Sequence, residues 1–516
     1  MFTRLHFEDW RIICHYLGAL VLLMAAAMCI PFFLALGLGE YDNAVMFLKS
    51  LGITTICGSL LALAKVQKCN MVWHQALIVT GLSWFVLSFF GTLPLWFSGH
   101  YATFQDALFE GVSGITATGL SIAIDIDHMA LSMITWRFIL HLSGGIGVLV
   151  IALALGIFGT GAGAASVYQA EAREGRVMPE VRSMARFIFR VTGTVICAGV
   201  IACAIPLLVG GQEPLRAFFS SLWITISAFA TGGMTGQSMG IMAYHSWPLE
   251  VITMCLMFFG IINFTLYGEI WHGRLKHIFK DIEVRTMAVW IFALMMVVAI
   301  AIMAGSYFND FFALVRRTLY LVVSASTNVG FSTVYPGQIM YAMGSGAFFM
   351  IGVGMIVGGS SSSTTGGIKA FRIGIIAKTI VQTVREALVP DHVRPRTFYY
   401  HMGRKLLTPD LASAALTTFL MYILTFAVGA VVGILSGYDA LPAIFESISA
   451  ASNGGLSSGI VSAGMPRFLE GVYIVEMLLG RLEFVAVFAM LLQFFQSLLP
   501  IDRTELFKRK RKEGSR

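Results

Sequence analysis

The sequence predicts an all-α integral membrane protein, and three observations support that prediction. Of the 516 residues, 57% are hydrophobic and only 12% are charged, whereas soluble domains carry about 25% charged residues. Apolar stretches long enough to span a bilayer as helices recur between Ile12 and Leu499. Between these stretches a short segment repeats four times. The composition excludes a soluble globular protein, and the stretches lack the period-two alternation of an outer-membrane barrel.

The apolar stretches, taken in order, predict a hairpin followed by four units of like orientation. The hairpin has spans near 12–38 and 44–64, joined by an acidic turn. Each unit then contributes two spans, which lie near 72–96 and 133–158, 191–209 and 251–270, 287–303 and 339–357, and 411–435 and 472–492.

The net charge is +7, and the basic residues are distributed as the topology of these spans predicts. Six segments hold 28 of the 35 lysines and arginines, at 4–11, 65–68, 173–190, 274–285, 369–405 and 503–516. Basic residues concentrate on the cytoplasmic side of membrane proteins, so we expect these segments and both termini in the cytoplasm. The charge therefore does not indicate a nucleic-acid partner. The run at 508–512 is either in contact with anionic lipid or a solvated tail.

The four short segments, near 104–121, 215–238, 311–333 and 441–458, share the pattern aromatic-x3-Ser-x5-Gly. The aligned residues are Phe109, Ser113 and Gly119; Trp223, Ser227 and Gly233; Tyr320, Ser324 and Gly330; and Phe445, Ser449 and Gly455. Each segment is too short to cross the membrane and return as two helices. We therefore predict a short pore helix that ends near the serine and continues into a run of small and polar residues.

These runs predict a selectivity filter. Irregular backbone at membrane depth occurs where it lines a watery cavity or is buried in protein. Four such runs on one axis would present carbonyl oxygens that replace the hydration shell of a monovalent cation. The predicted filter residues are Thr116, Ala117, Thr118 and Gly119; Ala230, Thr231, Gly232 and Gly233; Thr327, Asn328, Val329 and Gly330; and Ser452, Asn453, Gly454 and Gly455. The alternative is a set of interfacial helices with turn glycines.

A second irregular run interrupts the second helix of the third unit. It reads Gly358, Gly359, Ser360, Ser361, Ser362, Ser363, Thr364, Thr365, Gly366, Gly367, followed by Ile368 and Lys369. A Walker A phosphate loop is excluded, because the residue before Lys369 is not glycine and no strand is expected ahead of it. The run starts 28 residues after Gly330, and Arg481 follows Gly455 by 26, so we expect both at similar depth. The alternative is a Ser-rich cytoplasmic linker.

Arg481 is the one basic residue in the middle of an apolar stretch. An arginine at that depth costs about 2.5 to 3.5 kcal/mol on insertion scales, so it normally faces a polar interior. Glu483 is two residues away and points to another face of the helix. We therefore expect Arg481 to contact the 358–367 run and to repel a cation below the filter. The alternative is packing against a carboxylate elsewhere.

Taken together, these residues resemble the Trk/Ktr/HKT superfamily of potassium transporters over the whole chain, and the N-terminal hairpin resembles its bacterial TrkH/TrkG branch. Further matching motifs are Trp136-Arg137, Gly144-Gly145-Ile146-Gly147, the run from Gly358 to Lys369, and Gly480-Arg481-Leu482-Glu483. The resemblance implies that the filter binds potassium and that residues 358–367 form an intramembrane gating loop with Arg481. It also implies a preference for potassium over sodium, since plant members with serine in place of the first filter glycine prefer sodium.

The resemblance implies the following division of the chain: 1–70, an N-terminal transmembrane hairpin; 71–165, pore unit 1; 166–280, pore unit 2; 281–390, pore unit 3 with the gating loop 358–367; and 391–516, pore unit 4 with a basic cytoplasmic tail. It implies a homodimer in the bacterial inner membrane. A cytosolic TrkA-like nucleotide-binding subunit is expected on the basic loops 173–190 and 385–405. Membrane lipid is the remaining partner, with no nucleic acid.

Channel-like potassium uptake is the function that the resemblance implies, with potassium as the substrate and no cofactor in this chain. The alternative is a proton- or sodium-coupled symporter, or another secondary transporter built from inverted repeats. Four units of like orientation favour the pore.

Little in the sequence supports an enzyme, because no apolar region contains a Ser/His/Asp, Cys/His or metal-ligand cluster. The seven cysteines include no CxxC motif, and they predict neither a zinc site nor a disulfide framework. His141 is interpreted as a hydrogen-bonded core residue. Glu110 and Glu446 share a register three residues before the repeat serine, and they either add negative potential outside the filter or act as capping or solvated carboxylates.

Overall fold

The computed structural model describes residues 7–64, 72–147, 150, 181–271, 273–305, 311–335, 344–390, 396–484, 487–488 and 490–493. Over these residues the protein is helical apart from two short two-stranded sheets. Within these described ranges, six helices are long and apolar enough to cross a membrane, and a seventh candidate is a bent pair. The predicted all-α membrane protein is confirmed.

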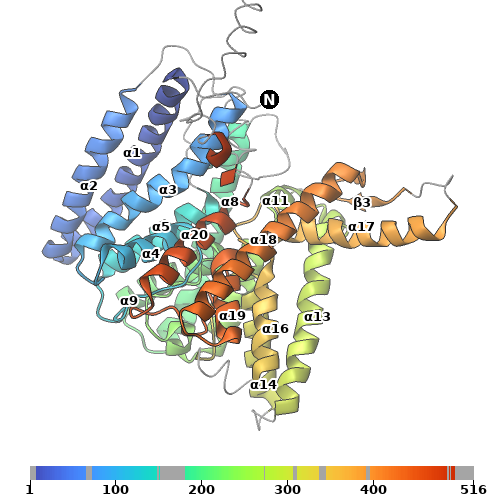
Figure 1. Ribbon diagram of the computed structural model, residues 1–516. Helices are drawn as coiled ribbons and strands as arrows, with labels where there is room; N and C mark the ends of the chain where they lie inside the picture. Colours follow the sequence, from blue (N-terminus) through green and yellow to red (C-terminus); the bar gives the residue numbers. More distant parts are fainter. Residues whose placement is uncertain are drawn as a thin grey trace, which may run out of the picture.

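The N-terminal hairpin consists of α1 (Phe7–Leu38) and α2 (Tyr41–Ala62). Both lie along one side of the molecule next to α3 (Figure 1). The two helices approach closely at Gly18, where an added Cβ would lie 2.4 Å from the backbone nitrogen of Ala62. A small residue at such a crossing lets two membrane helices pack backbone to backbone.

Each of the four units contains a long helix, a short pore helix and a second helix. In unit 1 these are α3 (Trp73–Phe97), α4 (Phe104–Ile115) and α5 (Leu131–Ile146). In unit 2 they are α8 (Val181–Val209), α9 (Pro214–Phe229) and α10 (Trp247–Ile261), with a 3-10 helix η1 (Gly240–Tyr244) ahead of α10, and α11 (Phe264–Trp271) and α12 (Leu275–Ile278) after it.

In unit 3 the corresponding helices are α13 (Ile282–Gly305), α14 (Phe311–Ser326) and α16 (Gly344–Ile356). Strands β1 (Val357–Gly358) and β2 (Ile368–Lys369) and helix α17 (Ala370–Leu388) follow. Strands β3 (Phe398–Tyr400) and β4 (Arg404–Leu406) form an antiparallel hairpin that leads into unit 4. Unit 4 contains α18 (Pro409–Leu435), α19 (Ala440–Ser452) and α20 (Arg467–Arg481).

The second helices of all four units end at corresponding depths. Helices α5, α10, α16 and α20 end at Ile146, Ile261, Ile356 and Arg481, which lie 26 to 28 residues after the filter glycine of each unit. After α10 the chain bends by 104° into α11. The prediction of one continuous helix over 251–270 is therefore wrong. The sequence singled out a break only in unit 3, whereas the structure has an equivalent break in each unit.

Several predicted features lie outside the described residues. These are both chain termini with the 508–512 run, Cys69, the 173–180 part of the first basic loop, the 151–158 end of a predicted span, and the 339–343 start of another. The boundaries between the predicted domains stay predictions.

Candidate functional site: four filter segments above a buried loop

The repeat spacing Ser-x5-Gly corresponds to one backbone hydrogen bond that occurs in every unit. The residue before each filter glycine donates its N–H to the carbonyl of the repeat serine. The four bonds are Thr118 to Ser113 (2.9 Å), Gly232 to Ser227 (2.9 Å), Val329 to Ser324 (3.1 Å) and Gly454 to Ser449 (2.8 Å). Each pore helix therefore holds its own filter strand at the same point.

The four filter segments also share one backbone conformation. The residue two positions before the glycine is left-handed in each unit, with φ of 54° at Ala117, 52° at Thr231, 53° at Asn328 and 53° at Asn453. The glycines themselves have φ of 92° at Gly119, 73° at Gly233, 85° at Gly330 and 74° at Gly455. A β-branched residue such as Thr231 rarely adopts a positive φ. Such strain is typical of functional sites, where the surrounding structure imposes it.

The filter glycines form a closed ring in the order of the units. A Cβ added to Gly119 would lie 2.2 Å from the carbonyl oxygen of Gly232, and one on Gly233 would lie 2.2 Å from that of Val329. A Cβ on Gly330 would lie 2.8 Å from the carbonyl oxygen of Gly454, and one on Gly455 would lie 2.5 Å from that of Thr118. The carbonyl that precedes each glycine thus lies against the glycine of the preceding unit in the ring. A side chain at any of these four positions would therefore force the backbones of two neighbouring units apart.

Two asparagine side chains link neighbouring units below this ring. The Asn453 amide donates to Thr118 Oγ1 (2.8 Å) and to the carbonyl of Met477 (3.0 Å). The Asn328 amide donates to the carbonyls of Ser452 (2.7 Å) and Met355 (3.1 Å). All these groups are buried, so each bond also satisfies a polar atom that would otherwise be costly. The filter is therefore held from one unit to the next by side chains as well as by packing.

Glu110 and Glu446 play the same structural role in units 1 and 4. Glu110 accepts hydrogen bonds from Ser121 Oγ and the Ile122 N–H, 11 and 12 residues further on. Glu446 accepts from Ser457 Oγ and the Ser458 N–H at the same two offsets. Both carboxylates are completely buried. The interpretation of these residues as solvated carboxylates is wrong, because they anchor the chain that leaves each filter.

Arg137 also supports the filter and is 1% exposed. Its Nη2 lies 2.6 Å from Glu110 Oε1 and 3.0 Å from Ser121 Oγ, and its Nη1 donates to the carbonyl of Thr235 (3.3 Å). It therefore links the chain segment that follows filter 1 to the segment that follows filter 2. It lies within α5, inside the predicted span 133–158.

His141 lies directly behind the second filter. A Cβ added to Gly232 would come within 1.8 Å of His141 Nδ1. The ring is completely buried, and neither nitrogen has a hydrogen-bond partner among the described residues. His141 is thus a core residue, as expected, but the expected hydrogen bond is not formed with any described residue, and the ring packs against the filter backbone.

The loop 358–367 is buried directly beneath the filter, which excludes the cytoplasmic-linker interpretation. Strands β1 and β2 pair in parallel and close its two ends together. Thr364 Oγ1 donates to the carbonyls of Phe229 (2.9 Å) and Gly260 (3.0 Å), and Thr231 Oγ1 in filter 2 lies 3.3 Å from it. At the other end, a Cβ on Gly366 would lie 2.5 Å from the carbonyl of Ser452 in filter 4. The loop therefore contacts filter segments on opposite sides of the ring.

Arg481 contacts this loop as the sequence predicts. Its Nη1 donates to the carbonyl of Thr364 (2.6 Å), and its Nη2 donates to the carbonyl of Gly145 (3.2 Å) and also to that of Gly144. Glu483 pairs instead with Arg372 at 2.5 Å. The guanidinium thus holds the loop of unit 3 to the broken end of α5 in unit 1.

A buried ionic network connects the loop to the β3–β4 hairpin. Glu283 accepts hydrogen bonds from the Ser361 N–H (2.8 Å) and from the Asn263 amide (3.1 Å). Asp281 accepts from the Glu283 N–H (2.9 Å) and pairs with His401 Nδ1 at 3.1 Å. Asp281, Glu283 and His401 could offer ligand atoms within 4.8 Å of one another. Since each carboxylate already has hydrogen-bond partners, we interpret the cluster as an ion-paired strut.

The stability of the β3–β4 hairpin is expected to depend on pH through the ion pair between Asp281 and His401. Burial opposes the charged form of His401, but the Asp281 hydrogen bond and the charges of Glu283 and Asp281 outweigh this and raise the pKa of His401 above its usual 6.5. The ion pair therefore stabilises the folded hairpin fully below that usual value and is lost as pH rises through the elevated pKa. We expect amide hydrogen exchange of residues 398–406, corrected for intrinsic rates, to increase at alkaline pH.

His401→Gln should remove most of this pH dependence, whereas His277→Gln should keep it. His277 is an exposed histidine paired with Glu269 close to the same hairpin. An unchanged exchange profile in His401→Gln would contradict the strut.

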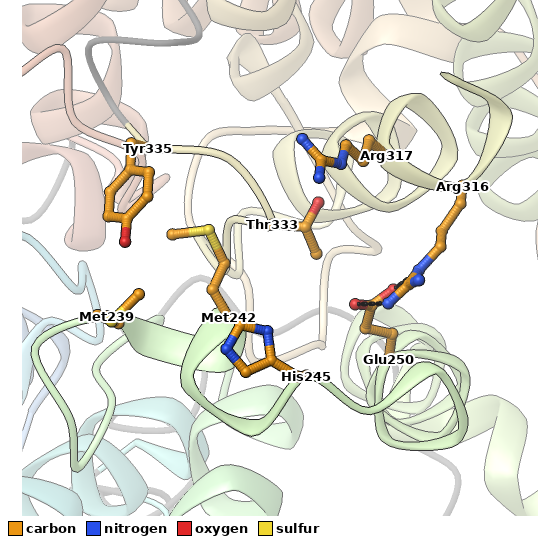
Figure 2. A pocket seen from close by; sticks show the side chains of 8 residues that line it. All are labelled: Met239, Met242, His245, Glu250, Arg316, Arg317, Thr333 and Tyr335. Atoms are coloured by element: carbon orange, nitrogen blue, oxygen red, sulfur yellow. Dashed lines mark hydrogen bonds and ion pairs between the residues drawn. The ribbon is translucent and has the colours of Figure 1, made fainter. Parts of the chain in front are cut away.

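A pocket of about 350 Å³ lies beside filters 2 and 3, on the side away from the loop. Figure 2 shows its lining side chains, among them Met242 and His245 from the chain after filter 2 and Thr333 and Tyr335 from the chain after filter 3. Glu250 holds Arg316 in a two-point ion pair with bonds of 2.6 and 2.7 Å. The pair joins α10 to α14, and its carboxylate offsets the positive charge of Arg316 at this pocket.

Comparisons with known proteins agree with this geometry. The TrkH family, described as cation transport protein, matches residues 44–502. The chain belongs to the TrkH family. The family resemblance seen in the sequence is thereby confirmed. Relatives include a cation transporter of Methanocaldococcus jannaschii, which is 28% identical over 94% of this chain and 96% of its own length. The Trk system potassium uptake protein TrkH of Halomonas elongata is 27% identical over 92% of this chain and 97% of its own.

The fold is also that of a solved TrkH structure. The crystal structure of the potassium transporter TrkH from Vibrio parahaemolyticus matches with a TM-score of 0.78 at 23% sequence identity, over 95% of this chain and 98% of that one. All these relatives are named as transporters rather than enzymes. As a member of the TrkH family with several membrane-spanning helices, the chain is a membrane cation transport protein.

Proposed function

We propose that this TrkH-family chain takes up potassium through the four-segment filter. It would lie in a bacterial inner membrane, with both termini and the basic loops on the cytoplasmic side. The observation that supports this most is the closed ring of Gly119, Gly233, Gly330 and Gly455, in which the carbonyl before each glycine lies against the glycine of a neighbouring unit. Carbonyl rings bind a monovalent cation without adding fixed charge, so that the ion enters and also leaves. Relatives named as potassium uptake proteins supply the choice of ion.

The filter positions that would bind potassium are the sixteen residues predicted from the sequence, in units 1 to 4. The ion is substrate and not a resident cofactor. An inward current needs no other energy source, because one elementary charge gains about 2.3 kcal/mol per 100 mV of membrane potential. Coupling to protons or sodium is the competing proposal.

The loop 358–367 is proposed as the gate. It is buried under the filter, contacts Thr231 and the carbonyl of Ser452, and is held by Arg481 and by Glu283. Some of these contacts must break before an ion can leave the filter and pass the loop. A homodimer and a TrkA-like nucleotide-binding subunit on the basic loops 173–190 and 385–405 are proposed as the assembly that moves the gate.

Potassium-limited growth tests the proposed uptake. The chain, expressed in a bacterium that lacks its own potassium uptake systems, should restore growth at low potassium when its regulatory subunit is co-expressed. Restoration of sodium uptake without potassium uptake would overturn the proposal.

Arg481→Gln should raise potassium flux without reversing selectivity. The change removes the bond to the Thr364 carbonyl and a positive charge below the filter. Two like unit charges about 10 Å apart repel by about 1.7 kcal/mol at an effective dielectric constant of about 20. We expect a several-fold rise in rubidium tracer uptake.

Two other variants serve as controls for Arg481→Gln. Arg481→Lys keeps the charge and should stay near wild type, and Arg372→Gln removes a nearby arginine whose carboxylate partner is Glu483. Lower flux in a well-folded Arg481→Gln protein would contradict the barrier role and favour a packing role.

A further inference from the structure

A groove at the basic end of α13 combines an apolar floor with a cationic rim. Its volume is about 680 Å³, within the range of roughly 300 to 1,000 Å³ typical of small-ligand sites. It lies between α13, α17 and the β3–β4 hairpin. In Figure 1, α17 runs across the end of α13 with β3 beside it.

Four cations line the groove, and its lining contains no acidic residue. The cations are Lys280, Arg285, Lys378 and Arg404. Among the described residues, none of the four forms an ion pair with a carboxylate. Lys378 and Arg285 donate hydrogen bonds to neutral carbonyls, those of Phe398 (3.1 Å) and Phe279 (2.9 Å) respectively. Within the described part of the chain, no direct ion pair neutralises them.

Phe398 brings two of these cations together. The Arg404 guanidinium carbon lies 4.1 Å from the centre of the Phe398 ring, and Lys378 donates to the Phe398 carbonyl. Stacking on an aromatic ring holds a guanidinium in place without neutralising it. A cation of α17 and a cation of the hairpin therefore lie at the same rim of the groove.

The floor of the groove continues into the membrane-facing side of α13. Val289, Trp290 and Ala293 line the groove, and further along the helix Phe292, Ile300 and Met303 are 67%, 62% and 62% exposed. Helix α13 is one of the six candidate spans, so this exposed apolar side faces lipid tails. A docking site for a soluble protein would not continue along a membrane span.

We propose that this groove binds an anionic phospholipid, with the phosphate among the four cations and an acyl chain along α13. Basic pockets between membrane helices recognise anionic headgroups. The inference needs only a membrane protein and does not depend on which ion the filter conducts. The same elements hold the gating loop, because α13 begins beside Asp281 and Glu283 and α17 follows β2 directly. A bound lipid would therefore stabilise the closed arrangement of the loop.

The test uses the purified full chain without any regulatory subunit. Binding of phosphatidylglycerol is measured by native mass spectrometry and by the shift in melting temperature, with phosphatidylcholine as the comparison lipid. One variant replaces the rim cations by Lys280→Gln, Arg285→Gln, Lys378→Gln and Arg404→Gln. The matched control removes four exposed cations outside the groove by Lys276→Gln, Arg385→Gln, Arg396→Gln and Lys405→Gln.

Each basic residue close to an anionic headgroup contributes about a fivefold gain in affinity. We expect the rim variant to lose phosphatidylglycerol affinity by at least about tenfold, and the control to keep it. A third variant, Ala293→Trp, fills the apolar floor at an exposed position, leaves every charge in place, and should also weaken binding. It keeps the test decisive if the rim variant fails to fold.

Equal losses in the rim and control variants would overturn the proposal in favour of general surface attraction. Undiminished binding in the rim and Ala293→Trp variants would also overturn it. If the rim variant keeps lipid binding but no longer forms dimers, the groove belongs to a second copy of the chain. If it keeps lipid binding but no longer captures the regulatory subunit, the groove belongs to that subunit. Potassium flux that fails in every variant, with lipid binding intact, would count against the proposed transport and not against this site.

Discussion

Gly119→Ser is expected to lower the potassium-to-sodium permeability ratio by about tenfold or more, equivalent to about 1.4 kcal/mol. Gly119 has a φ of 92°, and an added Cβ would lie 2.2 Å from the Gly232 carbonyl oxygen. Serine would therefore push apart filters 1 and 2 at the point where carbonyls are proposed to replace the hydration shell of potassium. The measurement is the shift in reversal potential of reconstituted protein under potassium and sodium gradients.

Gly437→Ser provides a matched control for this substitution. Gly437 has a φ of 95°, and nothing lies within 4 Å of an added Cβ. The two variants share the cost of a side chain in a left-handed conformation, but only Gly119→Ser has the clash. Selectivity should stay at the wild-type value in Gly437→Ser. A wild-type permeability ratio in folded Gly119→Ser would contradict the proposed filter register.

Deletion of residues 361–364 is expected to raise basal potassium flux more than any single substitution. The deletion removes the Ser361 bond to Glu283, the Ser362 bond to the Phe264 N–H, and the bonds of Thr364 to the pore helix, to α10 and to Arg481. It should therefore open the path below the filter even without a regulatory subunit. Tracer uptake into proteoliposomes measures the change, and unchanged selectivity shows that the filter is intact.

A double variant tests whether Arg481 acts through this loop. If it does so, adding Arg481→Gln to the deletion should give little further increase, because residues that share one contact are not additive. Basal flux that is unchanged by the deletion, in a protein with wild-type melting temperature, would contradict the gate.

The repeated elements of the fold could be predicted because each repeat has its own local pattern. The predicted segment at 311–333 contains the observed helix Phe311–Ser326, and the segment at 441–458 contains all but the first residue of Ala440–Ser452. The Ser-x5-Gly spacing reflects a hydrogen bond that spans five residues, so the alignment of four copies reveals it. The loop was visible because ten consecutive small or polar residues cannot continue a membrane helix.

The remaining features depend on contacts between distant parts of the chain. The breaks after α5 and α10 have no polar run to mark them and are surrounded by apolar residues. The Asp281–His401 pair joins residues 120 apart, and Asn453 meets Thr118 across 335 residues. Arg137 and Glu110 gave a usable signal, a charged residue in each of two neighbouring apolar segments, because buried charges require partners. His141 gave no such signal, since its packing against Gly232 follows only from the assembled ring.

Ion selectivity and reversal potential in proteoliposomes test the central claim most directly. Currents are recorded with potassium, rubidium, sodium and lithium in turn, while pH and sodium gradients are varied independently. The proposed filter predicts conduction of potassium and rubidium well above that of sodium and lithium, with a current that reverses at the potassium equilibrium potential in every pH and sodium gradient. Equal conduction of all four ions, or a reversal potential that moves with the proton or sodium gradient, would contradict a potassium-selective pore.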